Sequence, residues 1–163
     1  MRTSQEWKSL NETQRAIITQ HQGALPVAVG AIAKAFGLVV LKSTMQGSIS
    51  GEIRESEGVV TIKVNRHDVK ERQRFTLAHE IAHFLLHRER LIGGITDDIL
   101  YRSRLSDDLE REANRLAADI IMPSSLIEPA LQACSNLKPE ERYKKIAEQA
   151  QVSLAAIKIR TGK

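Results

Sequence analysis

The sequence predicts an α+β fold, in which a small mixed or antiparallel sheet packs on a long helix and a helical C-terminal portion follows. Two observations predict it. Strand-like segments are concentrated between residues 38 and 64, where β-branched residues and period-two alternation occur. From residue 70 onward, apolar residues recur instead at spacings of three and four, which is typical of helices.

We expect a single domain over residues 1–163, because the length suits one hydrophobic core. Residues 1–70 would form N-terminal helices and the sheet, 71–123 two central helices, and 124–163 the helical C-terminal portion. A hydrophobic share of 42% is enough for such a core, whereas a net charge of +4 is too small to indicate a dedicated DNA-binding protein.

Cysteine usage and the N-terminus bear on the compartment. Cys134 is the only cysteine, which excludes an intramolecular disulfide and permits a reducing compartment. The N-terminus is polar, and no stretch approaches the ~18 continuous apolar residues that span a membrane. We therefore expect a cytoplasmic protein without a membrane partner.

The first half of the chain divides into two helices and three strands. A helix is predicted over 5–21 and a second from Pro26 to a C-terminal cap at Gly37. Residues 38–41 form a short strand, and 47–64 form a hairpin that turns at Glu57-Gly58.

The second half is helical. One helix is expected over 70–87 and another from about 107 to 122, where Pro123 ends it. Helices over 124–133, 140–150 and from Ser153 to Ile159 follow, and the basic tail 158–163 is interpreted as a solvated end.

His79-Glu80-x-x-His83 is the chemically most informative motif in the chain. Positions i and i+4 share one helix face, so both imidazoles can bind one zinc ion, with Glu80 beside them as general base. Burying such residues without partners costs a few kcal/mol, so a metal is the natural way to satisfy them.

A catalytic zinc needs a third protein ligand, for which we favour Glu110 on the following helix. Asn114, four residues later, lies on the same face and can hydrogen-bond the outer nitrogen of a ligating histidine. Ala113 and Ala117 would let the two helices approach closely. Glu112 is the alternative, but it projects about 160° away from Glu110.

The other histidines are not expected to bind the same ion. His87 lies about 12 Å along the helix from His79, too far for one zinc to hold both together with His83. It is predicted to lie at the surface or to contact a ligand. His21 and His67 are expected to be exposed.

Segment 74–83 with this motif, the run 110–118 and Met122-Pro123 together resemble the ImmA/IrrE family of bacterial and phage metallo-endopeptidases. The resemblance continues upstream through 26–38 and downstream into 152–160. The chain departs from the usual pattern at Leu116, where phenylalanine is commoner; the substitution keeps a large apolar side chain.

The resemblance implies a minimal zincin fold, with zinc held by His79, His83 and Glu110, and with Glu80 acting on water. It also implies a partner: a helix-turn-helix repressor of the Xre or Cro type, encoded nearby. Its site-specific cleavage would release stress-response, mobile-element, prophage or toxin–antitoxin genes. The alternative is a protein that keeps the zinc and acts by binding the regulator without cutting it.

Two further hypotheses concern the mechanism and DNA. An additional donor for the oxyanion is expected among four residues, Tyr101, Arg102, Arg104 and Tyr143. Residues 139–160 have the spacing of a helix-turn-helix, but 153–157 lack the Arg, Asn and Gln that read base edges. Direct DNA binding is therefore not expected.

Overall fold

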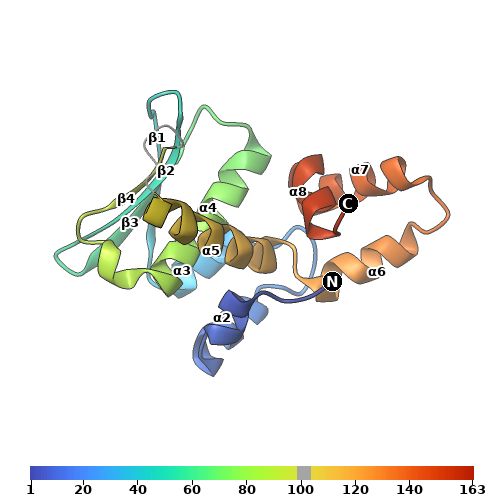
Figure 1. Ribbon diagram of the computed structural model, residues 1–163, viewed down its shortest axis with the longest axis horizontal. Coiled ribbons are helices and arrows are strands. Elements are labelled where there is room, and N and C mark those ends of the chain that lie inside the picture. The colour runs from blue at the N-terminus through green and yellow to red at the C-terminus, as the bar shows by residue number, and fades with distance from the viewer. Residues whose placement is uncertain (99–103) are drawn as a thin grey trace.

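The computed structural model describes residues 1–98 and 104–163, and the side chains outside 97–106. A sheet occupies one end of the molecule and the helices α6, α7 and α8 the other, with α4 and α5 between them (Figure 1). The predicted α+β class is confirmed. Helix α4, Lys70–Leu86, contacts β2 and β3 on one side and α5, Arg104–Ile121, on another.

The N-terminal helix predicted over 5–21 is wrong as a single element. Two helices replace it, α1 (Gln5–Ser9) and α2 (Glu12–Thr19). Asn11 starts the second helix, because its side chain accepts a hydrogen bond from the Gln14 backbone while the Gln14 side chain accepts one from the Asn11 backbone. This capping box outweighs the weak periodicity that suggested one continuous helix.

Helix α3, Val29–Ala35, begins three residues later than Pro26, which follows a cis peptide bond with Leu25. Proline therefore precedes this helix instead of opening it. Gly37 has a φ of +75°, which confirms the predicted glycine cap after the helix.

Four strands of the described residues form one mixed sheet in the order β1-β3-β2-β4. Strand β1 (Val39–Ser43) is parallel to β3 (Val59–Asn65), which is antiparallel to β2 (Ile49–Ser56). The predicted hairpin is confirmed: its turn residues, Glu57 and Gly58, have φ values of 51° and 78°, the left-handed conformation that a two-residue hairpin favours.

Strand β4, Ile95–Asp98, was not predicted, because the segment 88–106 had no regular pattern. It is short, follows two glycines and a 3-10 turn (Arg88–Arg90), and pairs antiparallel with β2 across a register shift. Such an edge strand has its structure imposed by its partner, not by its own sequence.

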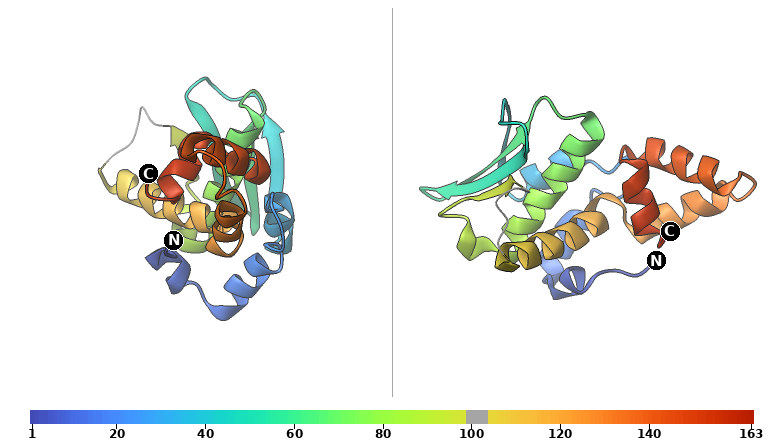
Figure 2. Two further views of the ribbon diagram at one scale, coloured as in Figure 1. Left: turned by 90° about the vertical axis from the view of Figure 1, so that its right-hand side faces the viewer. Right: turned by 45° about the horizontal axis from the view of Figure 1, so that its top comes forward.

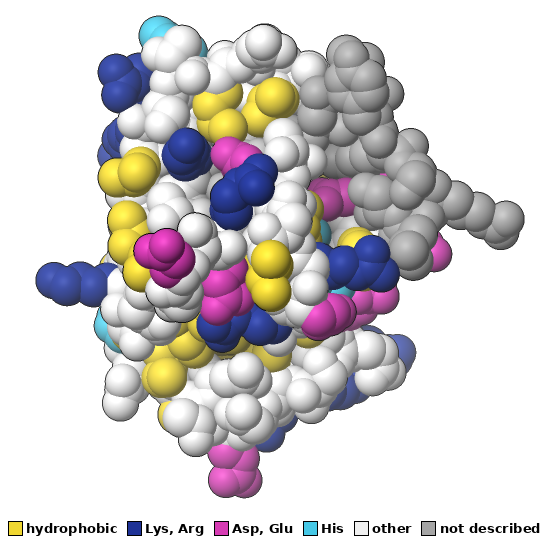
Figure 3. Space-filling view, turned by 90° about the vertical axis from the view of Figure 1, so that its left-hand side faces the viewer, with side chains coloured by type: hydrophobic (Ala, Val, Ile, Leu, Met, Phe, Trp, Pro, Cys, Tyr) yellow, Lys and Arg dark blue, Asp and Glu magenta, His cyan; other side chains and the backbone are white. Residues whose placement is uncertain are grey.

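The sheet presents one apolar face to the helices. Val60, Ile62 and Val64 alternate inward along β3 and are buried, together with Ala78 and Ile81 of α4. The outer surface is mixed: hydrophobic side chains are interspersed with charged ones where the sheet end faces the viewer (Figure 3). Exposed apolar residues of β1 and β3 include Val39, Leu41 and Val59.

Arg74 fastens α4 to the neighbouring backbone. Its guanidinium donates hydrogen bonds to the carbonyl oxygens of Val27 at 2.9 Å, Gln151 at 3.2 Å and Ala150 at 3.5 Å. Burial lowers the pKa of Arg74. This side chain therefore fixes α4 against both the N-terminal chain and the end of α7.

The predicted C-terminal helices are confirmed as α6 (Ser124–Ala133), α7 (Pro139–Ala150) and α8 (Leu154–Arg160). Among the helices of the described ranges, none has both the length and the apolar composition needed to cross a membrane. Gln151 is left-handed at the end of α7, and the Ser153 hydroxyl caps α8 as expected.

The basic tail is not simply solvated. The Arg160 guanidinium lies 2.7 Å from one carboxylate oxygen of Asp119, and both side chains are nearly inaccessible. The other Asp119 oxygen accepts a hydrogen bond from the Ser4 backbone, and Arg160 also donates to the Arg2 carbonyl. Residues near both ends of the chain therefore contact Asp119 of α5, and the two termini lie close together in the right-hand view of Figure 2.

Candidate metal centre

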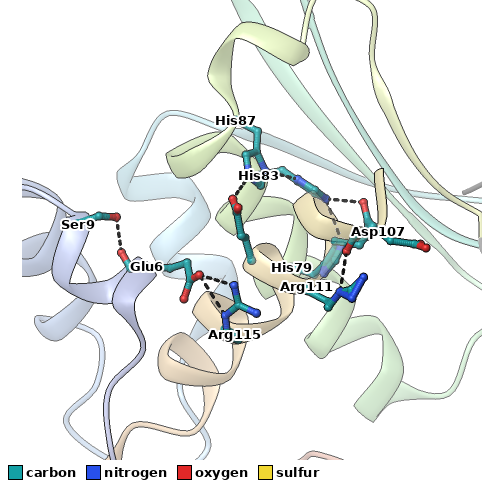
Figure 4. A network of polar contacts seen from close by, with 10 residues as sticks. Glu6, Ser9, His79, His83, His87, Asp107, Arg111 and Arg115 are labelled. Carbon is teal, nitrogen blue, oxygen red and sulfur yellow. Dashed lines mark hydrogen bonds and ion pairs between the residues drawn. The ribbon is translucent and has the colours of Figure 1, made fainter. Parts of the chain in front are cut away.

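The two motif histidines lie on the side of α4 that faces α5 (Figure 4). One helical turn separates His79 from His83, so their rings stack edge to face with centroids 4.7 Å apart. Their Nε2 atoms lie 3.1 Å from one another, and 3% and 0% of the two residues is exposed. Helical spacing alone thus brings two imidazole nitrogens to one buried point.

Glu110 of α5 completes this cluster. Its two carboxylate oxygens lie 2.7 Å from His79 Nε2 and 3.0 Å from His83 Nε2. The close approach of α5 is possible because Ala113 and Ala117, which have small side chains, are fully buried beside it. The structure thus brings together the three residues that the sequence predicted as metal ligands.

The cluster fits a divalent metal ion in geometry and in charge. The three candidate donor atoms lie within 4.8 Å of one another, and all three residues are buried. Burial lowers the pKa of His83, which favours the neutral ring that a metal requires. Burial alone would raise the pKa of Glu110, but hydrogen bonds and charge interactions with the two histidines hold it well below its usual range.

Asn114 occupies the predicted supporting position. Its side-chain oxygen lies 2.8 Å from His79 Nδ1, the nitrogen that points away from the cluster. Such a contact orients the ring and leaves Nε2 toward the metal. Glu112, the alternative third ligand, is absent from the cluster and contacts His87 instead.

His87 is neither a ligand nor a surface residue. It is buried at the end of α4, with its Nδ1 atom 2.8 Å from His83 Nδ1. Of the two histidines expected at the surface, His67 is exposed and His21 is half-buried, with Nδ1 near the Ile17 carbonyl oxygen. Of the two positions predicted for His87, the structure shows contact with the candidate ligand His83 and not a place at the surface.

Glu80 is fully buried and lies against the sheet. A Cβ atom built on Gly51 of β2 would lie only 2.9 Å from Glu80 Oε1 and 2.5 Å from Thr76 Cγ2. Gly51 was not among the residues predicted from the sequence to belong to the site. Its position could have indicated a role, because a glycine inside a predicted strand often marks a close approach of another group to the backbone.

A cleft of about 1140 Å³ adjoins the cluster, between α4–α5 and α7–α8. His79 and Asn114 lie in its wall, so the metal centre is next to this space. The rest of its lining is mixed: charged residues such as Arg72, Lys144 and Glu148 alternate with apolar side chains from both sides, among them Val69, Phe75, Met122, Leu154 and Ile159.

The part of the chain that the structure describes does not place any of the four predicted oxyanion donors at the metal centre. Tyr101 and Arg102 lie outside the described residues, and so does the side chain of Arg104. Tyr143 is half-buried against the hydrophobic core and does not line the cleft.

Comparison with known proteins identifies the family. The family model of the IrrE N-terminal-like domain, peptidase M78, matches residues 33–161. The chain belongs to this IrrE-like peptidase family. Among curated proteins none gives a significant match.

The matched region of this IrrE-like peptidase includes α4, α5 and the C-terminal helices, hence the entire cluster. The family is one of metallopeptidases, and the buried His79, His83 and Glu110 supply a group that could hold the metal. The predicted family resemblance is therefore confirmed.

Proposed function

We propose that the chain is a zinc-dependent endopeptidase that cuts a helix-turn-helix repressor of the Xre or Cro type. The observation that carries the catalytic part is the two-histidine, one-carboxylate cluster beside a cleft whose wall includes His79. Two nitrogens and one oxygen are a donor set typical of catalytic zinc, which keeps a fourth position for water.

His79, His83 and Glu110 would hold the ion. When bound, zinc supplies Lewis acidity, lowering the pKa of water toward ~7 and polarising the peptide carbonyl. Glu80 accepts the proton of the attacking water and delivers it to the leaving amine. Gly51 supports this role, because its missing side chain leaves room for the Glu80 carboxylate beside β2.

The cleft supports a polypeptide substrate. The apolar wall of α8 stands opposite α4, so a bound segment would place apolar side chains against Leu154 and Ile159. The repressor as substrate, and a cytoplasmic setting in stress-response, mobile-element or toxin–antitoxin regulation, rest on the family resemblance.

The decisive experiment mixes the purified protein and zinc with the helix-turn-helix regulator encoded beside its gene. Mass spectrometry should find one new pair of fragments. Glu80→Gln should keep zinc and lose cleavage, because the amide cannot accept the proton. Cleavage that survives Glu80→Gln would refute the mechanism.

A non-proteolytic anti-repressor is the second candidate. Its support is the same cleft, which would serve as a binding site only. An intact regulator that stays bound to the zinc-loaded protein would favour this alternative. Direct DNA binding gains no support, because four residues of α8 line the cleft: Leu154, Ala155, Ala156 and Ile159.

A further inference from the structure

His83 has an outer hydrogen-bond partner of an unusual kind. Its Nδ1 atom lies 2.8 Å from Nδ1 of His87, whose Nε2 atom in turn lies 2.8 Å from Glu112 Oε2. His87 is 3% exposed, whereas the Glu112 side chain is 40% exposed. A row of three side chains therefore runs from the cluster to the surface of α5; Figure 4 shows its two histidines.

The carboxylate end fixes the direction of every hydrogen bond in this row. An ionised carboxylate only accepts, so His87 must carry its proton on Nε2. A neutral imidazole has one donor and one acceptor, which leaves His87 Nδ1 as an acceptor. His83 must then donate from Nδ1, and its Nε2 atom keeps a lone pair.

The direction matters because Glu110 favours the opposite tautomer of His83. Its carboxylate oxygen lies 3.0 Å from His83 Nε2 and would accept a hydrogen bond from an N–H at that atom. A His83 protonated on Nε2 cannot bind a metal there. The outer nitrogen of His79, Nδ1, lies against an amide instead, that of Asn114, and an amide can accept or donate and so does not enforce a tautomer.

We propose that His87 and Glu112 are positioning residues that hold His83 in the tautomer whose Nε2 lone pair faces the metal. The inference rests on the metal site of the proposed function. It assigns roles to two residues that lie outside the metal cluster and do not line the cleft. It also gives a reason for the burial of the His87 imidazole beside the candidate ligand His83.

The test measures zinc affinity by competition with a chelator, and the tautomer of His83 by ¹⁵N NMR of the metal-free protein. His87→Leu should weaken zinc binding about 10- to 100-fold, because the outer acceptor is lost. Glu112→Gln should weaken it about three- to tenfold, since an amide no longer enforces the direction. Glu112 is near the surface, so this variant remains informative if His87→Leu does not fold.

Two controls make the result specific. Asp108→Asn removes an exposed carboxylate from the same helix and should leave zinc affinity unchanged. In the double variant, Glu112→Gln should add nothing once His87 is leucine, because the two residues act in series.

The NMR readout separates this inference from the proposed function, since it needs neither cleavage nor zinc. The expected spectrum shows His83 protonated on Nδ1 in the wild-type protein and a shift toward Nε2 protonation in His87→Leu. Wild-type zinc affinity in both variants, or an Nε2-protonated His83 in the metal-free wild type, would overturn the proposal. Loss of cleavage alone bears only on the peptidase.

Discussion

Replacing Gly51 by alanine is expected to disable the protein without touching a metal ligand. The added Cβ would lie 2.5 Å from Thr76 Cγ2 and 2.9 Å from Glu80 Oε1. Ordinary contacts between carbon atoms are about 3.5–4.0 Å, so Thr76 has to retreat by about 1 Å or more. Both neighbours belong to the buried face of α4, and neither can move into solvent.

The size of the effect follows from these contacts. Overpacking of a well-packed core costs about 1–3 kcal/mol, which for a chain of this length lowers Tm by roughly 3–10 °C. A displacement of about 1 Å at a reacting group costs about 100-fold in rate. Cleavage should therefore fall much further than stability, and zinc binding should persist because His79, His83 and Glu110 are untouched.

The assay pairs thermal unfolding and zinc content with the rate of regulator cleavage. Gly51→Ala combined with Thr76→Ser removes the closer clash, so Tm should recover while cleavage stays low. Gly30→Ala is the matched control: nothing lies within 4 Å of its Cβ, and alanine in helix α3 should stabilise by about 0.5–1 kcal/mol. A Gly51→Ala protein that unfolds and cleaves like the wild type would refute the reasoning.

Three further outcomes are expected. The hydrogen bond from Arg115 lowers the pKa of Glu6, so this pair stabilises the fold above the ordinary value of 4.5 and the contribution is lost as the pH falls below it. Glu6→Gln should thus lower the free energy of unfolding in urea by about 1 kcal/mol at pH 7. The difference from wild type should shrink under acid conditions, and an equal difference at pH 3 and pH 7 would contradict this. Arg74→Met should cost about 2–3 kcal/mol in the same measurement, because it removes the hydrogen bonds that the guanidinium donates to three backbone carbonyls. An unchanged midpoint would count against that role. Ile159→Asp should raise KM about tenfold with Tm unchanged, since the residue is 78% exposed and lines the cleft. The control Ile92→Asp, at a residue that is 76% exposed and outside the cleft lining, should leave KM unchanged. Equal effects of the two variants on KM would exclude α8 from substrate binding.

The metal centre was largely predictable because it depends on helical periodicity. A spacing of four residues on a helix places His79 beside His83, and the same spacing places Asn114 near Glu110. That α5 would turn this face toward α4 followed from the small residues next to Glu110. The contact between His83 and His87 was harder to predict from the sequence, because spacing alone does not say whether the ring of His87 points inward.

The departures in the fold have local causes. One helix became two because the Asn11 cap competes with weak apolar periodicity, and such a cap is easily missed among polar residues. Strand β4 forms by pairing with β2, which no feature of its own four residues indicates. Arg160 was interpreted as part of a solvated tail because its partner, Asp119, is more than forty residues away in sequence.

The meeting of the chain ends on Asp119 has a practical consequence. Arg2 and Arg160 both line the cleft, so anything fused to either end emerges at its entrance. An affinity tag left in place would compete with a large substrate for that space and would make the enzyme look less active than it is. The same proximity makes the ends suitable for a pair of fluorophores, whose energy transfer would report a change in the separation of the two ends when a substrate binds.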